Sequence, residues 1–292
     1  MSEPLSELPL TDAVLSTLVA IGLPEPKPGS PLFRAAWPEP SSAQLALGRL
    51  FLTGCGMLET DEASPTEAGE RLWLALETLC DPVEQLLLVE SKPGVGTSRT
   101  LLAVADGVIA PLHLLPQGAT VGAALSRDEL IPLVTKAWSA DPVDRALLQL
   151  PREALELVTR LWAVVGHDVK GSVELASFEG DVAQVIEELA PLLEVVGLVN
   201  VKDGHLKLQQ EFKRPLLSLW RGPRLELRAL PNAGEPSSAD PGPHFIVVGE
   251  EGRRYLVLTP HSTGGVLVAD ESVAFVPLTT EVLREQLSGV LP

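Results

Sequence analysis

Apolar residues recur along the chain with two alternating periods, one helical and one typical of strands. In residues 10–21, "LTDAVLSTLVAI", they lie three and four positions apart, which predicts a helix that ends before Gly22 and Pro24. From Glu84 onward three apolar runs, "EQLLLVES", "RTLLAVADG" and "VIAPLHLL", are separated by turn residues and predict an antiparallel meander. The pattern therefore predicts a mixed α+β fold.

Polar residues mark where further helices begin. Ser41 with Gln44, and Ser126 with Glu129, have the spacing of capping boxes and predict helices through about Leu52 and through "SRDELIPLVTKAW". Ser64 followed by Pro65 and by an acidic residue at position 67 predicts another helix start, after a short strand at 57–60.

The second half of the chain repeats this order of elements. Helices are predicted in "LPREALELVTRLWAVVG" and, from Asp181, in "DVAQVIEELAPLLEVV", where Pro191 indicates a kink or break. A hairpin around Asp203 and Gly204 and the helix "QQEFKRPLLSLW" follow. The remaining predicted elements are the strands "RLELRAL", "HFIVV", "RYLVL", "GVLVA" and "SVAFV" and a closing helix, "TEVLREQLSGVL".

A constant offset links the two halves. It is 141 residues for two pairs of turn residues, from 197 − 56 and from 223 − 82, namely Gly56 with Gly197 and Pro82 with Pro223. Asp106 then corresponds to Asp270 after an insertion at 231–243. This register favours an internal duplication, whereas the alternative is two ordinary α+β segments with similar turn chemistry.

On the duplication hypothesis the halves are residues 1–145 and 146–292, related by a pseudo-twofold axis. Each half contains a winged-helix-like helical unit plus a small antiparallel sheet. Joining the two around the axis would protect sheet edges that are otherwise exposed.

Composition narrows the class of partner. The net charge is −17 and the pI about 4.7, which argues against nucleic acid as the main partner, because phosphate neutralisation needs a basic face. Two cysteines, Cys55 and Cys80, are too few for a disulfide framework and indicate reduced thiols. The N-terminus has no basic n-region and no apolar run approaches about 20 residues, so we expect a cytoplasmic protein with no membrane partner.

No motif for catalysis, a cofactor or a metal emerges. The segment 92–99, "KPGVGTSR", lacks the lysine of a phosphate-binding loop and joins two predicted strands. None of the five histidines has a second ligand at zinc spacing; His113, inside an apolar run, is predicted to be a hydrogen-bonded core residue. We therefore predict that the chain is not an enzyme and has no cofactor.

Two basic segments stand out in this acidic chain. Residues 202–228 contain seven Lys and Arg against three acids, a pattern that fits a solvated face, internal ion pairs or a site for an acidic partner protein. In "GRRYLVL", Arg253 and Arg254 supply charge and Tyr255 an amphipathic side chain, so these three are the candidate partner-binding residues. The alternative interpretation of that segment is an ordinary hairpin with solvated arginines.

The order of elements resembles the EspG family of cytoplasmic chaperones in type VII secretion. The resemblance rests on a helix that ends in "AIGLP", a Gly-Met-Leu step into a helix, "CDPVEQLLLV", "RTLLAVADGVIAPLHLLP" and a closing "SRDELIPLV". It implies a pseudo-twofold fold of sheets and helical bundles and a C-terminal surface that recognises a secreted partner. The second half of the chain departs further from the family pattern than the first.

The leading hypothesis is therefore a non-enzymatic chaperone or adaptor that holds a partner protein, such as a secreted helical hairpin. It would bury an apolar helical tip in a groove or against a strand, with charged residues at the rim. The alternative is a tandem winged-helix protein in DNA organisation or regulation, as an acidic scaffold rather than a direct DNA reader. The oligomeric state, a small-molecule pocket between the halves and the role of the Pro-rich segments 23–40 and 231–243 stay open.

Overall fold

The computed structural model describes most of the chain. The described residues are 7–33, 40–59, 64–67, 69–138, 147–165, 171–230, 243–249, 253–259 and 272–291. Several sequence expectations lie outside them, namely those on Asp270, the strand at 265–269, the boundary at 145–146 and nearly all of the insertion at 231–243.

Eight helices and two sheets make up the described residues. The helices are α1 (Asp12–Ala20), α2 (Ser42–Gly54), α3 (Glu70–Cys80), α4 (Arg127–Trp138), α5 (Arg152–Val165), α6 (Asp181–Val195), α7 (Gln210–Arg221) and α8 (Thr280–Val290), with a 3₁₀ turn at Leu175–Ser177. The strands are β1 (Glu7–Leu10), β2 (Glu84–Lys92), β3 (Gly96–Ala105), β4 (Val108–Leu115), β5 (Gly118–Gly122), β6 (Leu125–Ser126), β7 (Leu148–Pro151), β8 (Ser172–Glu174), β9 (Val199–Lys202), β10 (His205–Leu208), β11 (Arg224–Ala229), β12 (Pro243–Val248), β13 (Tyr255–Leu258) and β14 (Ser272–Pro277). The α+β class is confirmed.

One antiparallel sheet runs through both halves of the chain. Its order is β1-β5-β4-β3-β2-β11-β12-β13-β14-β7, with β6 beside β4, while β8, β10 and β9 form a separate small sheet. The halves meet where β2 pairs with β11, in a register that places Leu88 opposite Leu227. Two edge strands that would otherwise expose their backbone groups thus satisfy each other.

The face of the sheet that packs on α4 and α8 carries the central core. Leu225 and Leu227 of β11 alternate with polar residues and lie in one cluster with Leu86, Phe245 and Trp138. Because this cluster draws on strands from both halves and on α4 packed against α8, it joins the halves across the β2–β11 pair.

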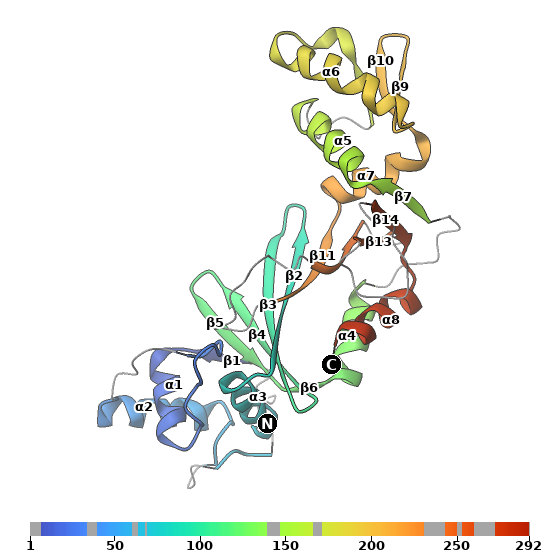
Figure 1. The fold of residues 1–292 in the computed structure, drawn as a ribbon. Helices are drawn as coiled ribbons and strands as arrows, with labels where there is room; N and C mark the ends of the chain where they lie inside the picture. Colours follow the sequence, from blue (N-terminus) through green and yellow to red (C-terminus); the bar gives the residue numbers. More distant parts are fainter. Residues whose placement is uncertain are drawn as a thin grey trace.

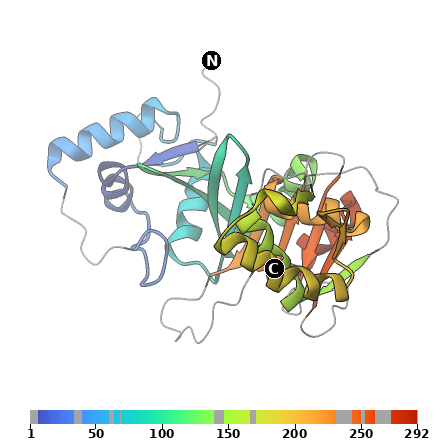
Figure 2. The same cartoon turned by 90° about the horizontal axis from the view of Figure 1, so that it is seen from above.

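Helical units cover the two ends of the opposite face. Helices α1, α2 and α3 lie over the N-terminal strands, with a core that includes Leu76 and Leu112. Helices α5, α6 and α7, with the small sheet, form a second core with β13 and β14 that includes Trp162 and Phe275. Figures 1 and 2 show these units at opposite ends of the molecule, with the central strands between them.

The local signals that predicted these elements are present in the structure. Ser41 and Gln44 form the capping box of α2. At the start of α4 the Ser126 N–H donates to Glu129 at 2.8 Å; this hydrogen bond, followed by that from Arg71, lowers the pKa of the Glu129 carboxyl. Asp106 and Asp203 adopt positive φ, 51° and 53°, in the two predicted Asp-Gly turns.

The helix start predicted at Ser64 is wrong. Pro65 instead pairs with Leu58 in an isolated bridge, and α3 begins at Glu70. The reason is a close approach: a Cβ on Gly69 would lie 2.2 Å from the carbonyl oxygen of Met57, so the chain turns in at this glycine before the helix forms. The Thr66 hydroxyl fixes the turn, because it donates to Gly56 O and accepts from Gly69 N.

The break predicted at Pro191 is absent, because this proline lies inside α6 without ending it. Asp270 lies outside the described residues, so its correspondence with Asp106 stays a prediction.

Candidate functional site

The middle of the sheet, between the two helical units, presents a mixed charged and apolar face. Arg224, Glu226 and Arg228 lie two residues apart on β11 and so point to the face opposite the central core. Their cross-strand neighbours on β2 include Leu87 and Val89, both half-buried.

Glu226 is the most buried charge on this face. Its side chain is 7% exposed; Arg224 Nη2 donates to Glu226 Oε2 at 2.7 Å, and Arg228 donates to Oε1. Burial lowers the pKa of the Arg224 guanidinium, which still remains charged at neutral pH. The two arginines compensate the buried carboxylate and hold the strand's polar side fixed.

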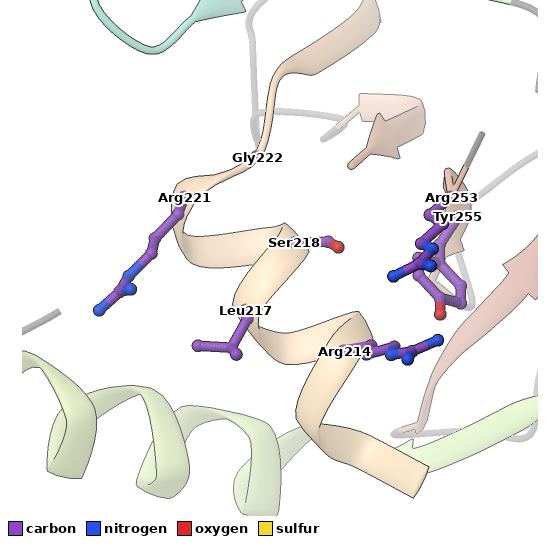
Figure 3. A pocket seen from close by; sticks show the side chains of 7 residues that line it. All are labelled: Arg214, Leu217, Ser218, Arg221, Gly222, Arg253 and Tyr255. Carbon is purple, nitrogen blue, oxygen red and sulfur yellow. The ribbon is translucent and has the colours of Figure 1, made fainter. Parts of the chain in front are cut away.

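A pocket of about 250 Å³ flanks this face beside α7. It is lined by residues of α7, the glycine after it, the segment before β13 and the first residue of β13, namely Arg214, Leu217, Ser218, Arg221, Gly222, Arg253 and Tyr255. Figure 3 shows Arg214 and Ser218 on the side of α7 that faces Arg253 and Tyr255, while Leu217 and Arg221 point the other way. The four-residue spacing of Arg214 and Ser218 places both on one helix face.

Hydrogen-bond donors dominate the side of the pocket that faces β13. Arg214 and Arg253 both line this side, together with Ser218 and Tyr255. Within the described part of the chain no carboxylate forms an ion pair with either arginine. The pocket is thus a positively charged spot on a protein whose net charge is −17.

Two glycines bring the pocket's walls together. The Gly222 N–H caps α7 by donating to Ser218 O at 2.8 Å, and Gly249 N donates to Pro223 O at 3.0 Å. A Cβ on Gly222 would lie 2.9 Å from Gly249 Cα, so neither backbone leaves room for a side chain. This contact sets the distance between α7 and the segment that carries Arg253.

We expect Gly249→Ala to destabilise the fold by about 2–3 kcal/mol and to move Arg253. Gly249 has φ +113°, and an added Cβ would lie 2.4 Å from the Arg253 carbonyl oxygen, so strain and a backbone clash combine. Urea unfolding followed by circular dichroism measures the change. Gly289→Ala in α8 is the matched control, because its Cβ meets nothing within 4 Å and alanine favours the helix; equal stability of the two variants would contradict the expectation.

The structure divides the three residues predicted from "GRRYLVL" between two faces. Arg253 is exposed, and Tyr255 is 2% exposed with its side chain on the same pocket. Arg254 is 9% exposed and points to the other face, where its guanidinium lies 4.8 Å from the Trp138 ring centroid and Nη1 donates to Ala137 O at 3.3 Å. Adjacent residues of an extended segment alternate in this way.

Arg214 and Ser218 were not singled out by the sequence analysis. The signal that pointed near them was the basic stretch 202–228, which contains Arg214. That stretch splits in the structure: Arg224 and Arg228 form ion pairs with Glu226, while Arg214 lines the pocket. The segment thus contains both internal ion pairs and an arginine that lines a pocket.

Other sequence candidates occupy structural positions. Residues 92–99 lie at the turn of the β2–β3 hairpin. His113 Nδ1 lies 2.9 Å from the Thr100 hydroxyl, but the side chain is 37% exposed, so His113 is hydrogen-bonded without being a core residue. Burial, with smaller contributions from Glu77 and Asp81, raises the pKa of the Cys80 thiol to about 12, while Cys55 is half-buried. Within the described ranges no group of three or more His, Cys, Asp or Glu could hold a metal, and no helix is long and apolar enough to cross a membrane.

Comparison with known proteins finds a match in fold. No protein-family model and no curated protein sequence matches the chain. Among solved structures the chain is similar to the Mycobacterium tuberculosis type VII secretion system chaperone EspG5, solved in complex with a PE25–PPE41 dimer. The TM-score is 0.54 at 14% identity, and the match covers 98% of this chain and 97% of that one. The resemblance to the EspG family is therefore confirmed at the level of the fold.

Proposed function

We propose that the protein is a non-enzymatic, EspG-like chaperone of the cytoplasm that holds a partner protein destined for secretion. The observation that carries the proposal is the likeness in fold to EspG5, which extends over 98% of this chain and 97% of that one. EspG5 was solved with a protein dimer bound, which makes a protein the first partner to test.

The middle of the sheet is the surface that best suits such a partner. Leu87 and Val89 are half-buried there, Leu114 is 39% exposed, and Arg224 and Arg228 supply charge at 38% and 35% exposure. Apolar side chains framed by charged ones resemble the centre and rim of a protein interface. An apolar helical tip would bury these side chains, with Arg253 and Tyr255 at its flank and Arg254 holding the segment against Trp138.

The symmetric strand order supports the proposed duplication. Five strands of each half, β1-β5-β4-β3-β2 and β7-β14-β13-β12-β11, follow the same spatial sequence outward to inward, and α4 and α8 close each half and pack together. In the C-terminal half α5, β8, α6 and the β9–β10 hairpin follow the order of a winged helix. In the N-terminal half the described residues show the Leu58–Pro65 bridge at the place of the hairpin.

Partner capture from the native cytosol tests the function. We expect the tagged chain to co-purify with one stoichiometric helical partner, identified by mass spectrometry and by the mass of the complex in light scattering. Val89→Gln should weaken the complex of purified components roughly tenfold, because it removes apolar contact at the centre of the surface.

The matched control is Val83→Gln, at a position 72% exposed just before the same strand, and we expect it to change affinity less than twofold. A protein that is monomeric and binds no partner would contradict the proposal. Equal weakening by the two substitutions would remove the middle of the sheet as the binding surface.

A further inference from the structure

We infer that the pocket between α7 and β13 is a binding site for an oxyanion, a carboxylate or a phosphate group. The inference concerns the chemistry of the pocket and does not need the proposed chaperone function. Its basis is that Arg214, Ser218, Arg253 and Tyr255 converge from two elements on one cavity of about 250 Å³.

The four side chains present donors to the pocket. Each guanidinium carries N–H donors only and stays charged at any physiological pH, and the two hydroxyls can turn their protons toward a common acceptor. Across the described ranges none of these four side chains has a hydrogen-bond or ion-pair partner. A set of donors that the protein leaves without an acceptor complements an anion with several oxygen atoms.

The positive charges of Arg214 and Arg253 are a second reason to expect an anion in this pocket. Two arginines that line one pocket repel, and the protein places both there although acids outnumber bases by 39 to 22. Elsewhere on the same α7–β11 segment the protein pairs arginine with carboxylate, as Arg224 and Arg228 with Glu226. An anion between Arg214 and Arg253 would remove the repulsion and form charge-assisted bonds on both sides.

The pocket is also held in shape without a ligand. Gly222 and Gly249 fix the spacing of its walls through backbone contact, and the Tyr255 ring is 2% exposed and packed in the C-terminal core. A planar guanidinium on each side suits the bidentate recognition of carboxylate or phosphate oxygens. The Tyr255 ring adds an apolar wall on the side of the pocket that carries the two arginines.

Tyr255 is the single tyrosine of the chain and provides a direct probe. Tyrosine-selective isotope labelling gives NMR signals from this ring alone, so ligand titrations report on the pocket. The ligands are inorganic phosphate and a hexaglutamate peptide, each compared with sodium chloride at equal ionic strength. We expect a saturable shift of the ring signals with at least one of the two anions and none with chloride.

The two anions distinguish the source of the oxyanion. Tighter binding of hexaglutamate would assign the pocket to acidic side chains of a protein segment. Tighter binding of phosphate would assign it to a free phosphate or phosphoryl group. A ring that shows no saturable shift with either anion would overturn the inference.

Variants separate binding from structure. Arg214→Gln and Arg253→Gln should each weaken anion binding at least tenfold, whereas Arg284→Gln, an exposed arginine on α8, should leave it unchanged. Without anion and at low salt, Arg253→Gln should melt at or above the wild-type temperature, because the repulsion is gone. A melting temperature below that of the wild type would overturn the inference. A saturable shift of the Tyr255 ring signals that persists when Arg214→Gln and Arg253→Gln are combined would also overturn it. If partner capture fails while the anion still binds, the proposed function alone is rejected.

Discussion

Replacing Glu226 by glutamine is expected to lower the free energy of unfolding by about 3 kcal/mol. The carboxylate is 7% exposed and accepts hydrogen bonds from two arginines at the centre of the sheet. Glutamine keeps the shape but loses the charge, so both arginines lose an ionic partner. The expected loss in the free energy of unfolding is at the lower end of the range for a broken buried ion pair. The reason is that Arg224 and Arg228 are 38% and 35% exposed, so water can solvate them.

Urea unfolding at neutral pH measures this change. The control is Glu156→Gln, which removes the pair between Arg152 and Glu156 at 66% and 64% exposure and should cost about 0.5 kcal/mol or less. If the two substitutions cost the same, the Glu226 cluster adds nothing beyond an ordinary surface pair. Since β11 joins the two halves, loss of cooperativity between them would appear as a lower slope of the unfolding curve.

Trp162→Ala is expected to destabilise the protein by about 3–5 kcal/mol. The Trp162 ring is fully buried in the C-terminal helical unit and stacks on Trp220, with centroids 5.7 Å apart and planes at 17°. Truncation leaves a large cavity between α5 and α7. Because α7 carries Arg214 and Ser218, the same change should also loosen the basic pocket.

A second substitution at this position separates packing from polarity. The indole Nε1 of Trp162 is buried and has no hydrogen-bond partner among the described residues, so Trp162→Phe removes an unsatisfied donor and keeps a stacking ring. We expect a loss of about 1–2 kcal/mol, well below that of alanine. Circular dichroism during urea unfolding compares the two, and Val195→Ala, at 89% exposure, is the control. Equal losses for Phe and Ala would contradict the stacking account.

Much of the fold could be predicted from local signals. The meander β2–β3–β4, the helices from α4 to α8 and the Asp-Gly turns follow from periodicity and caps within a few residues. The wrong or missing predictions are explained by contacts between residues that are close in space but distant in the sequence. Ser64 has the chemistry of a helix cap, but the contact of Gly69 with Met57, twelve positions earlier (69 − 57), delays the helix. The strands β1, β5 and β7 are too short to show a period and exist because an edge was available for pairing.

The candidate site was only partly accessible to sequence reasoning. Arg253 and Tyr255 were singled out by charge and an amphipathic ring, and both line the pocket. Arg254 carries the same charge but points to Trp138, since neighbouring residues of an extended segment face opposite sides. Which face of this extended segment lies toward α7 depends on how the helices cover the sheet, and residues nearby in the sequence do not determine that.

By itself, the sequence determined the α+β class, most helices and strands, the acidic charge and the resemblance to a chaperone family, because each depends on composition or on residues a few positions apart. Only the tertiary structure decided that β2 pairs with β11 and that two helical units leave the middle of one sheet face half exposed. It also decided that Arg214 and Arg253, which are 253 − 214 = 39 residues apart, line one pocket. Such pairings are fixed by the burial of whole faces and the pairing of whole edges, which no local pattern encodes.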